Sequence, residues 1–192
     1  MRSWLNGYGA SVNQPKTDYS RKNFIDSAFT STQKNAIKTT NVVNNNNIDY
    51  GTAGGNNTSD KVFLLSESEG YGFVKDSETD DEARRSRCST YAYAMGTYRS
   101  YDTEYTKYNG NIWWWLRSPG IEGNYAAEVY KYGWGYRDGS YVDDTTDGVR
   151  PALHLNLAST NLYSYAGTVC SDAMKNGESG ADNPVNPGEP NR

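Results

Sequence analysis

The sequence predicts an α+β domain with short helices, short strands and long polar loops. Three observations lead to this fold class. Helix-type spacing of apolar residues, together with capping residues, occurs over short stretches in the first half of the chain. Compact apolar runs that suit strands lie at 61–65, 111–120 and 148–157. Between them lie polar segments rich in Asn, Gly and Thr without a hydrophobic period, and such segments are typical of loops.

The helices are expected early in the chain. Residues 18–29 have apolar side chains on one stripe and predict a short helix capped near Ser20. Thr30 and Gln33 have the spacing of a capping box, so a second helical turn follows. A third helix is expected over 77–96, where acidic residues precede arginines and Gly96 ends the segment.

The Asn-rich segment 41–60 is expected to be an exposed loop, with 44–47 the best candidate for disorder. The run 61–65 follows as a short buried strand. It ends at Ser66, whose spacing to Glu69 makes another capping box.

Two longer strands are expected in the second half. In 111–120, period two places alternate residues on opposite faces, and large rings on both faces predict burial on both sides. One face has Trp113, Trp115 and Arg117, and the other has Trp114, Leu116 and Ser118. The segment 148–157 alternates in the same way. Residues 172–192 are rich in Pro and Gly and predict a linker or tail.

The composition limits the classes of function. At 192 residues the chain suits one domain, with 35% hydrophobic residues and a mean hydropathy of -0.88. Its 17 tyrosines far exceed its 4 phenylalanines, and tyrosine recurs at interfaces. The net charge of -4 and a pI near 5.0 argue against nucleic acid as a partner. No apolar run has the length of a membrane span, so we expect no membrane insertion.

Four segments together resemble a bacterial domain family of unknown function. They are RSWLN (2–6), TSDKVFLLSESE (58–69), WWWLRSPG (113–120) and GVRPALHLNL (148–157). Members of that family carry WWLRSPG, then a variable hairpin, then GVRPAL. The resemblance runs from residue 2 to about residue 171.

This family is similar to the C-type-lectin-like fold, in the version shared by formylglycine-generating enzymes and the variable proteins of diversity-generating retroelements. The resemblance implies a small twisted antiparallel sheet, two helices and a loop-rich face that holds ligands. It implies one domain over 1–171, with 113–117 and 149–157 as central strands. Family members usually have further N-terminal strands, so we expect a domain that lacks them.

The residues do not indicate catalysis. The formylglycine-generating relatives use closely placed cysteines, whereas Cys88 and Cys170 are isolated, and they form no zinc site with His154 at a standard spacing. A disulfide between the two cysteines and two buried thiols both remain open. His154 lies mid-strand without a nucleophile motif, so we interpret it as a structural hydrogen-bonding residue. We expect no catalytic residue and no cofactor.

For the charged residues, a structural role is the favoured interpretation. Arg117 and Arg150 lie in strands that otherwise suit burial, so each is expected to be paired and to tie the sheet to loops. The alternative is an anchor for an anionic ligand. The acidic residues Asp138, Asp143, Asp144 and Asp147 lack the ligand spacing of a calcium loop, and we expect a solvated loop and no metal.

The candidate ligand-binding residues lie in 124–144, where tyrosines and a tryptophan alternate with small and charged residues. We expect a hairpin that turns near 131–133, with the small side chains against the sheet and the rings facing out. A different turn geometry would reverse this register. The predicted contact residues are Asn124, Tyr125, Glu128, Tyr130, Tyr132, Trp134, Tyr136, Asp138, Ser140, Tyr141 and Asp143.

Tyr and Trp mixed with Ser, Gly and Asp is also the composition of antibody paratopes. In the retroelement variable proteins, adenine-directed mutagenesis produces similar residue types at the corresponding place, although selection for a binding face gives a similar mixture. We expect a non-catalytic module, outside the cell, on its surface or on a phage particle. It would bind a protein or glycan on another cell or surface. The alternative is a structural or assembly domain whose aromatic face packs on a neighbour. The ligand and the oligomeric state remain open.

Overall fold

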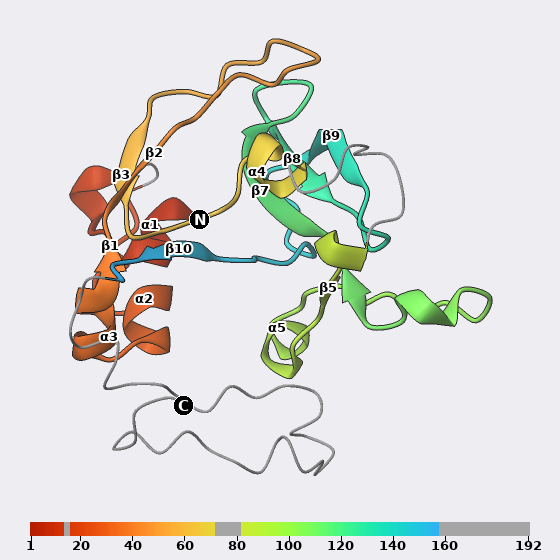
Figure 1. Cartoon of the computed structure of the whole chain (residues 1–192), viewed down its shortest axis with the longest axis horizontal. Coiled ribbons are helices and arrows are strands. Elements are labelled where there is room, and N and C mark those ends of the chain that lie inside the picture. Colours follow the sequence, from red (N-terminus) through yellow and green to blue (C-terminus); the bar gives the residue numbers. More distant parts are fainter. Residues whose placement is uncertain (14–15, 72–81, 158–192) are drawn as a thin grey trace.

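A computed structural model describes residues 1–13, 16–71 and 82–157. The chain folds into small antiparallel sheets and short helices, as the α+β prediction requires (Figure 1). Helices α1–α3 and strands β1–β3 lie on one side of the molecule, and the sheet β7–β8–β9 lies on the other. No helix within the described ranges is long and apolar enough to cross a membrane.

The first helices are held by local capping. They are α1 (Arg2–Asn6), α2 (Phe24–Ala28) and α3 (Ser31–Ala36). The capping box of Thr30 and Gln33 is confirmed, with hydrogen bonds of 2.8 and 3.3 Å. The predicted cap at Ser20 is wrong, because Asn23 caps α2. The Ser20 backbone instead donates to the Asp18 carboxylate, which forms a turn.

Two sheets are built from the first half of the chain and its last described strand. The order β1–β10–β4 joins Ile37–Lys38, Ala152–Leu155 and Val62–Phe63, and β2–β3 joins Thr40–Val42 and Thr58–Asp60. The capping box of Ser66 and Glu69 is confirmed at the start of α4 (Glu67–Tyr71).

The segment 77–96 is not one helix. Residues 82–84 form a 3-10 turn, and β5 (Ser86–Arg87) pairs with β6 (Asn111–Ile112). The helix α5 (Thr90–Ala94) starts only after the cap at Ser89. The buried Arg84 explains the difference, because its Nε donates to the Gly133 carbonyl, 49 positions away. A tertiary contact therefore overrides the local helical pattern. Residues 77–81 lie outside the described residues.

Strand β7 (Trp114–Pro119) is buried on both faces, as predicted. Trp115 packs with Leu5 and Val62 in one hydrophobic cluster. Trp114 and Leu116 pack in a second cluster that the hairpin strands complete. The two clusters lie on opposite sides of one strand, so β7 connects the two halves of the core.

The expectation of central strands is confirmed for 149–157 and wrong for 113–117. Strand β10 is central in its own sheet, whereas β7 is an edge strand of β7–β8–β9. The two segments meet at a single parallel bridge between Trp114 and Gly148. A Cβ at Gly148 would lie 2.3 Å from Ile112 Cδ1, so a larger residue there would require the Ile112 side chain to move. Pro151, which has no backbone donor, follows soon after and does not favour continued pairing.

The hairpin consists of β8 (Tyr125–Val129) and β9 (Gly135–Tyr141), so the predicted turn position is confirmed. Ala126 pairs with Ser140 and Glu128 pairs with Tyr136, so the three residues 137–139 of β9 face one residue of β8. This bulge depends on Gly139, which has a φ of 73°. The predicted tail 172–192 and Cys170 lie outside the described residues.

The Asn-rich segment 41–60 is not the fully exposed loop that we expected. Its ends pair as β2 and β3, and the residues between them reach across to the hairpin (Figure 1). Asn47, which we expected to be disordered, is 2% exposed. Because the 43–57 loop extends to the hairpin, residues of the two segments lie side by side.

Candidate functional site

A cleft of about 410 Å³ lies between the hairpin and the 43–57 loop. From the hairpin it is lined by Tyr130, Trp134, Gly135, Tyr136, Arg137 and Asp138, and from the loop by Asp49 and Tyr50. Four of the predicted contact residues therefore come together: Tyr130, Trp134, Tyr136 and Asp138. Its volume lies within the range of small-molecule sites, roughly 300–1,000 Å³.

Stacked rings form one wall of this cleft. Tyr130 contacts Trp113 at a centroid distance of 4.6 Å and stacks with Tyr136 at 4.7 Å. Tyr130 is half-buried, and burial raises the pKa of its hydroxyl above the usual value. Tyr130 and Tyr136 are therefore packed against neighbouring rings, unlike the freely exposed rings that we expected.

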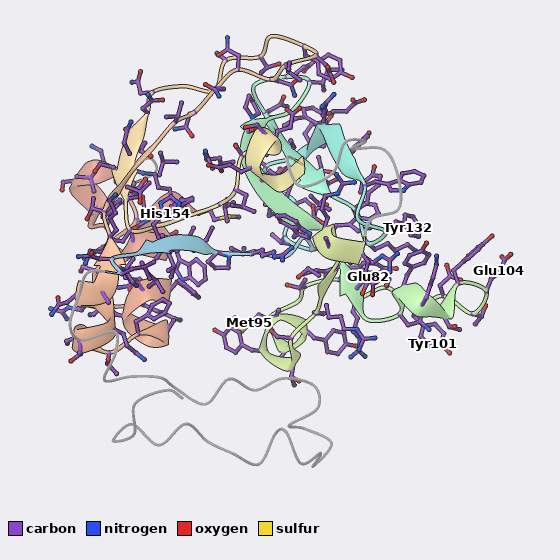
Figure 2. The ribbon with its side chains drawn as sticks, viewed as in Figure 1. Glu82, Met95, Tyr101, Glu104, Tyr132 and His154 are labelled. Atoms are coloured by element: carbon purple, nitrogen blue, oxygen red, sulfur yellow. The ribbon has the colours of Figure 1, made fainter. Side chains whose placement is uncertain are left out.

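Trp134 is the most accessible ring of the cleft wall on the hairpin, with 41% of its surface exposed. Tyr132 contacts the Trp134 ring at a centroid distance of 5.6 Å but is not part of the cleft lining. Tyr132 packs against Tyr108 at 4.6 Å, and its carbonyl accepts a hydrogen bond from Arg85. It lies on the side that carries Glu82 and the 100–109 segment (Figure 2). At the turn, the rings of the hairpin therefore continue from the cleft to Tyr108.

A network of charges forms the base of the cleft. Arg137 pairs with Asp49 at 3.0 Å and with Glu67 of α4. Burial raises the pKa of Glu67, an effect that Arg137 opposes. Period two placed Arg137 on the inner side of the hairpin, but the bulge at 137–139 interrupts the alternation there. Asp138 accepts a hydrogen bond from the Tyr50 hydroxyl, and this bond raises the pKa of Tyr50.

The remaining predicted residues at the open end of the hairpin are outside the cleft lining. Tyr125 and Tyr141 contact each other at 4.3 Å, and Asn124 receives a hydrogen bond from the backbone of Val142. Asn124 and Asp143 are exposed. Asn124, Tyr141 and Asp143 thus form an exposed patch on the same hairpin, with the half-buried Tyr125 against Tyr141.

The prediction that Glu128 faces outward is wrong, because none of its surface is exposed. It pairs across strands with Trp115, a core residue, so the sheet is covered at this point. Ser140 donates a hydrogen bond of 2.9 Å to Glu128 Oε1. Burial, followed by a hydrogen bond with Asp147, raises the pKa of Glu128 to about 9. Glu128 is therefore a buried protonated acid and does not contact a ligand on this face.

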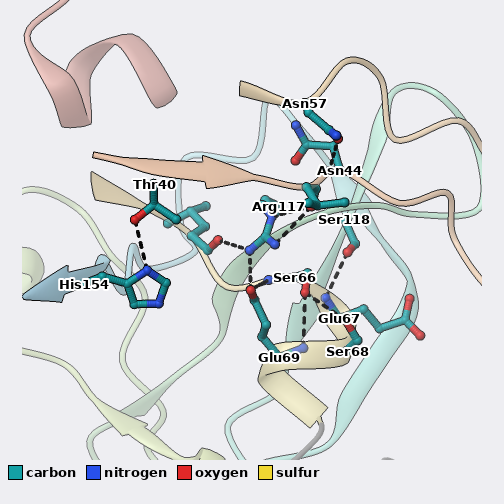
Figure 3. A network of polar contacts seen from close by, with 12 residues as sticks. Thr40, Asn44, Asn57, Ser66, Glu67, Ser68, Glu69, Arg117, Ser118 and His154 are labelled. Carbon is teal, nitrogen blue, oxygen red and sulfur yellow. Dashed lines mark hydrogen bonds and ion pairs between the residues drawn. The ribbon is translucent and has the colours of Figure 1, made fainter. Parts of the chain in front are cut away.

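The structural interpretation of two singled-out residues is confirmed. Arg117 donates to the carbonyls of Leu64 and Val43 and pairs with Glu69 (Figure 3). His154 Nδ1 lies 3.0 Å from the Thr40 hydroxyl (Figure 3). Both residues connect strands to neighbouring segments. Arg150 is exposed and lies over the Trp114 ring at 4.9 Å, a cation–π contact.

The acidic residues of the hairpin region lie in different environments. Asp138 contacts Tyr50, Asp147 contacts Glu128, and Asp144 accepts from the backbone of Thr146. Across the described part of the chain, no three His, Cys, Asp or Glu side chains are grouped to hold a metal ion.

The sequence patterns did not predict the two residues that the 43–57 loop contributes to the cleft. Asp49 and Tyr50 lie in a polar segment that we interpreted as an exposed loop. A usable signal was present, because Asp49-Tyr50-Gly51 repeats the aromatic, acidic and small composition of the hairpin. Their distance from the hairpin in sequence concealed the connection.

Comparison with known proteins identifies the family of the chain. No curated protein matches the sequence, and no solved structure matches the fold. One family model matches residues 1–157, which include all four segments of the predicted family resemblance. The chain therefore belongs to the family described as a domain of unknown function, DUF6273.

Proposed function

We propose that the chain is a non-catalytic module that binds a protein or glycan through the aromatic hairpin. The observation that carries the proposal is the cleft, in which supported rings and charged groups from two distant segments line one concave surface. Aromatic walls with a few placed polar groups are typical of binding sites. Trp134, accessible at the rim, is the side chain that we assign to the first contact.

We further propose that the fold is a version of the C-type-lectin-like fold and that the hairpin is its ligand-holding element. The small antiparallel sheets, the short helices and the loop-rich face support this relationship. The exposed residues Asn124, Tyr141 and Asp143 are of the types that retroelement mutagenesis produces, which supports diversification at this patch. Such a module would act outside the cell, on its surface or on a phage particle.

Array binding tests the proposal directly. The labelled chain is applied to a glycan array and to a peptide array, beside Trp134→Ala and the matched control Tyr101→Ala. Tyr101 is 81% exposed and belongs to a segment that is separate from the cleft lining. We expect a defined set of ligands that Trp134→Ala loses and Tyr101→Ala retains. Absence of specific binding on both arrays, or equal loss in both variants, would contradict the proposal.

A second candidate is a structural or assembly domain, and a separate surface favours it. Helix α5 and the residues after it expose Tyr91, Tyr93, Met95, Tyr98 and Tyr101. Apolar surface of this kind is typical of contact regions. If this surface packs against a second copy, light scattering after size exclusion will show a concentration-dependent dimer. Tyr91→Ser would then return the chain to a monomer without affecting the hairpin.

A further inference from the structure

The charges of the cleft do not balance locally. Asp49 is paired with Arg137, and Arg137 is shared with Glu67. Asp138 differs, because its side-chain partner within the described ranges is the neutral hydroxyl of Tyr50. Arg137, the cation of the cleft lining, pairs with Asp49 and Glu67, and no ion pair with Asp138 is found among the described residues. A ligand that supplies a positive charge is favoured at this position, whereas an anion is repelled.

The rings near Asp138 favour the same sign of charge. Tyr50, Trp134 and Tyr136 line the cleft with Asp138, and Tyr50 and Trp134 are 44% and 41% exposed. The face of an aromatic ring carries partial negative charge and attracts a cation placed over it. Rings and carboxylate therefore act together, and the interaction is strengthened where ring contact removes water from the cation.

The rings of the cleft and the partners of its two carboxylates indicate the kind of cation. A primary ammonium has three N–H donors and a guanidinium has five, and each donor needs an acceptor when it leaves water. Both carboxylates of the lining already have partners, because Asp138 accepts from Tyr50 and Asp49 pairs with Arg137. A methylated ammonium has few or no N–H groups, and its methyl groups gain from contact with rings.

We propose that this cleft binds an organic cation of the methylated or quaternary ammonium type. The cation lies over Tyr136, Trp134 and Tyr50, and Asp138 supplies the counter-charge. The proposal rests on the proposed function and narrows it to ligands that present such a group. The volume of about 410 Å³ accommodates a trimethylammonium group with part of its stem.

The test compares choline with 3,3-dimethylbutan-1-ol, which has the same shape without the charge. Titration calorimetry and Trp fluorescence measure binding of each probe to the full chain. We expect choline to bind at least about tenfold more tightly, because the neutral isostere loses both the cation–π and the carboxylate attraction. Equal affinity for the two probes overturns the proposal.

Conservative variants assign the interaction to the cleft. Asp138→Asn keeps the shape and removes the charge, and it should weaken choline binding about five- to tenfold. Glu104→Gln is the matched control, since Glu104 is exposed and outside the cleft lining, and it should leave binding unchanged. Trp134→Phe should bind more weakly than wild type and more tightly than Trp134→Ala. Equal effects of Asp138→Asn and Glu104→Gln overturn the proposal.

Competition separates this proposal from the broader one. If array ligands bind through Trp134 but choline does not compete with them, the binding module stands and the cation proposal fails. If choline competes, phosphorylcholine and Nε-trimethyllysine show which source of the cation fits the cleft. A neutral sugar that competes where choline does not would identify a stacking site for glycans and overturn the cation proposal.

Discussion

The side-chain amide of Asn47 donates a hydrogen bond of 2.9 Å to the backbone carbonyl of Arg137, 90 positions later in the chain. A second bond of 2.9 Å goes to the carbonyl of Pro119. The Asn47 oxygen accepts from the backbone N–H groups of Asp49 and Tyr50, at 2.9 and 3.1 Å. One buried side chain thus attaches the loop to the hairpin and orients the two loop residues of the cleft.

Asn47→Ala should lower the free energy of unfolding by about 2–3 kcal/mol, because buried donors and acceptors lose their partners. It should also weaken binding at the cleft, since Tyr50 loses its support. Denaturant unfolding followed by fluorescence measures the change. The control is Asn45→Ala in the same run, where the side chain is exposed and the cost should stay within about 0.5 kcal/mol. Equal costs at the two positions would contradict the assigned role of Asn47.

Truncation of Trp134 and of Trp115 should lower the stability of the fold by different amounts. Trp134 is 41% exposed and Trp115 is 4% exposed, within the cluster that contains Leu5 and Val62. Trp134→Ala should cost less than about 1 kcal/mol of stability, whereas Trp115→Ala should cost about 3–5 kcal/mol through lost burial and a cavity. Thermal melting of the two variants gives the comparison. A Trp134→Ala variant as unstable as Trp115→Ala would show that the hairpin rings hold the fold together.

Features set by neighbours in sequence could be predicted. The capping box of Thr30 and Gln33 needs only three residues of spacing, and it is present. The two-sided burial of β7 follows from rings at successive positions, because alternate side chains of a strand point to opposite faces. The hairpin turn near 131–133 lies between strands that are neighbours in sequence, and it too is present.

Features set by distant partners could not be predicted. Glu128 has the alternation of an outward residue, but Trp115 and Asp147 cover it from other segments. Asn47 resembles its neighbours in a run of four asparagines, and only its contacts with Pro119 and Arg137 distinguish it. The cleft has the same origin, since two of its eight lining residues, Asp49 and Tyr50, belong to the 43–57 loop.

Gly139 should be a position that tolerates no side chain. Its φ is 73°, and a Cβ would lie 2.0 Å from the carbonyl oxygen of Ala126. Gly139→Ala should therefore cost about 2–4 kcal/mol, from left-handed backbone strain and a clash with backbone. Urea midpoints measure the cost, with Gly123→Ala as control, because a Cβ there meets nothing within 4 Å. A neutral Gly139→Ala would mean that the bulge is not as described.

Glu128 gives the hairpin a dependence on pH. Burial and the hydrogen bond with Asp147 raise its pKa from 4.5 to about 9. The pKa of Asp147 is raised as well, first by burial. Between about pH 4.5 and 9 the folded chain keeps a proton on Glu128 that the unfolded chain has released. The free energy of unfolding should therefore decrease as pH rises through this window and change little above it.

Glu128→Gln removes this dependence and keeps the shape of the side chain. The glutamine oxygen can accept from Ser140, and its amide can donate to Asp147, as the protonated acid does. Relative to wild type, the variant should gain about 1 kcal/mol or more between pH 5 and pH 8, because only the wild-type side chain must retain a proton as pH rises. Chemical unfolding at the two pH values measures this gain. Glu122→Gln, at an exposed carboxylate of the same region, should show no comparable gain. If the stability of Glu128→Gln runs parallel to that of wild type from pH 5 to pH 8, Glu128 does not hold its proton in the folded chain.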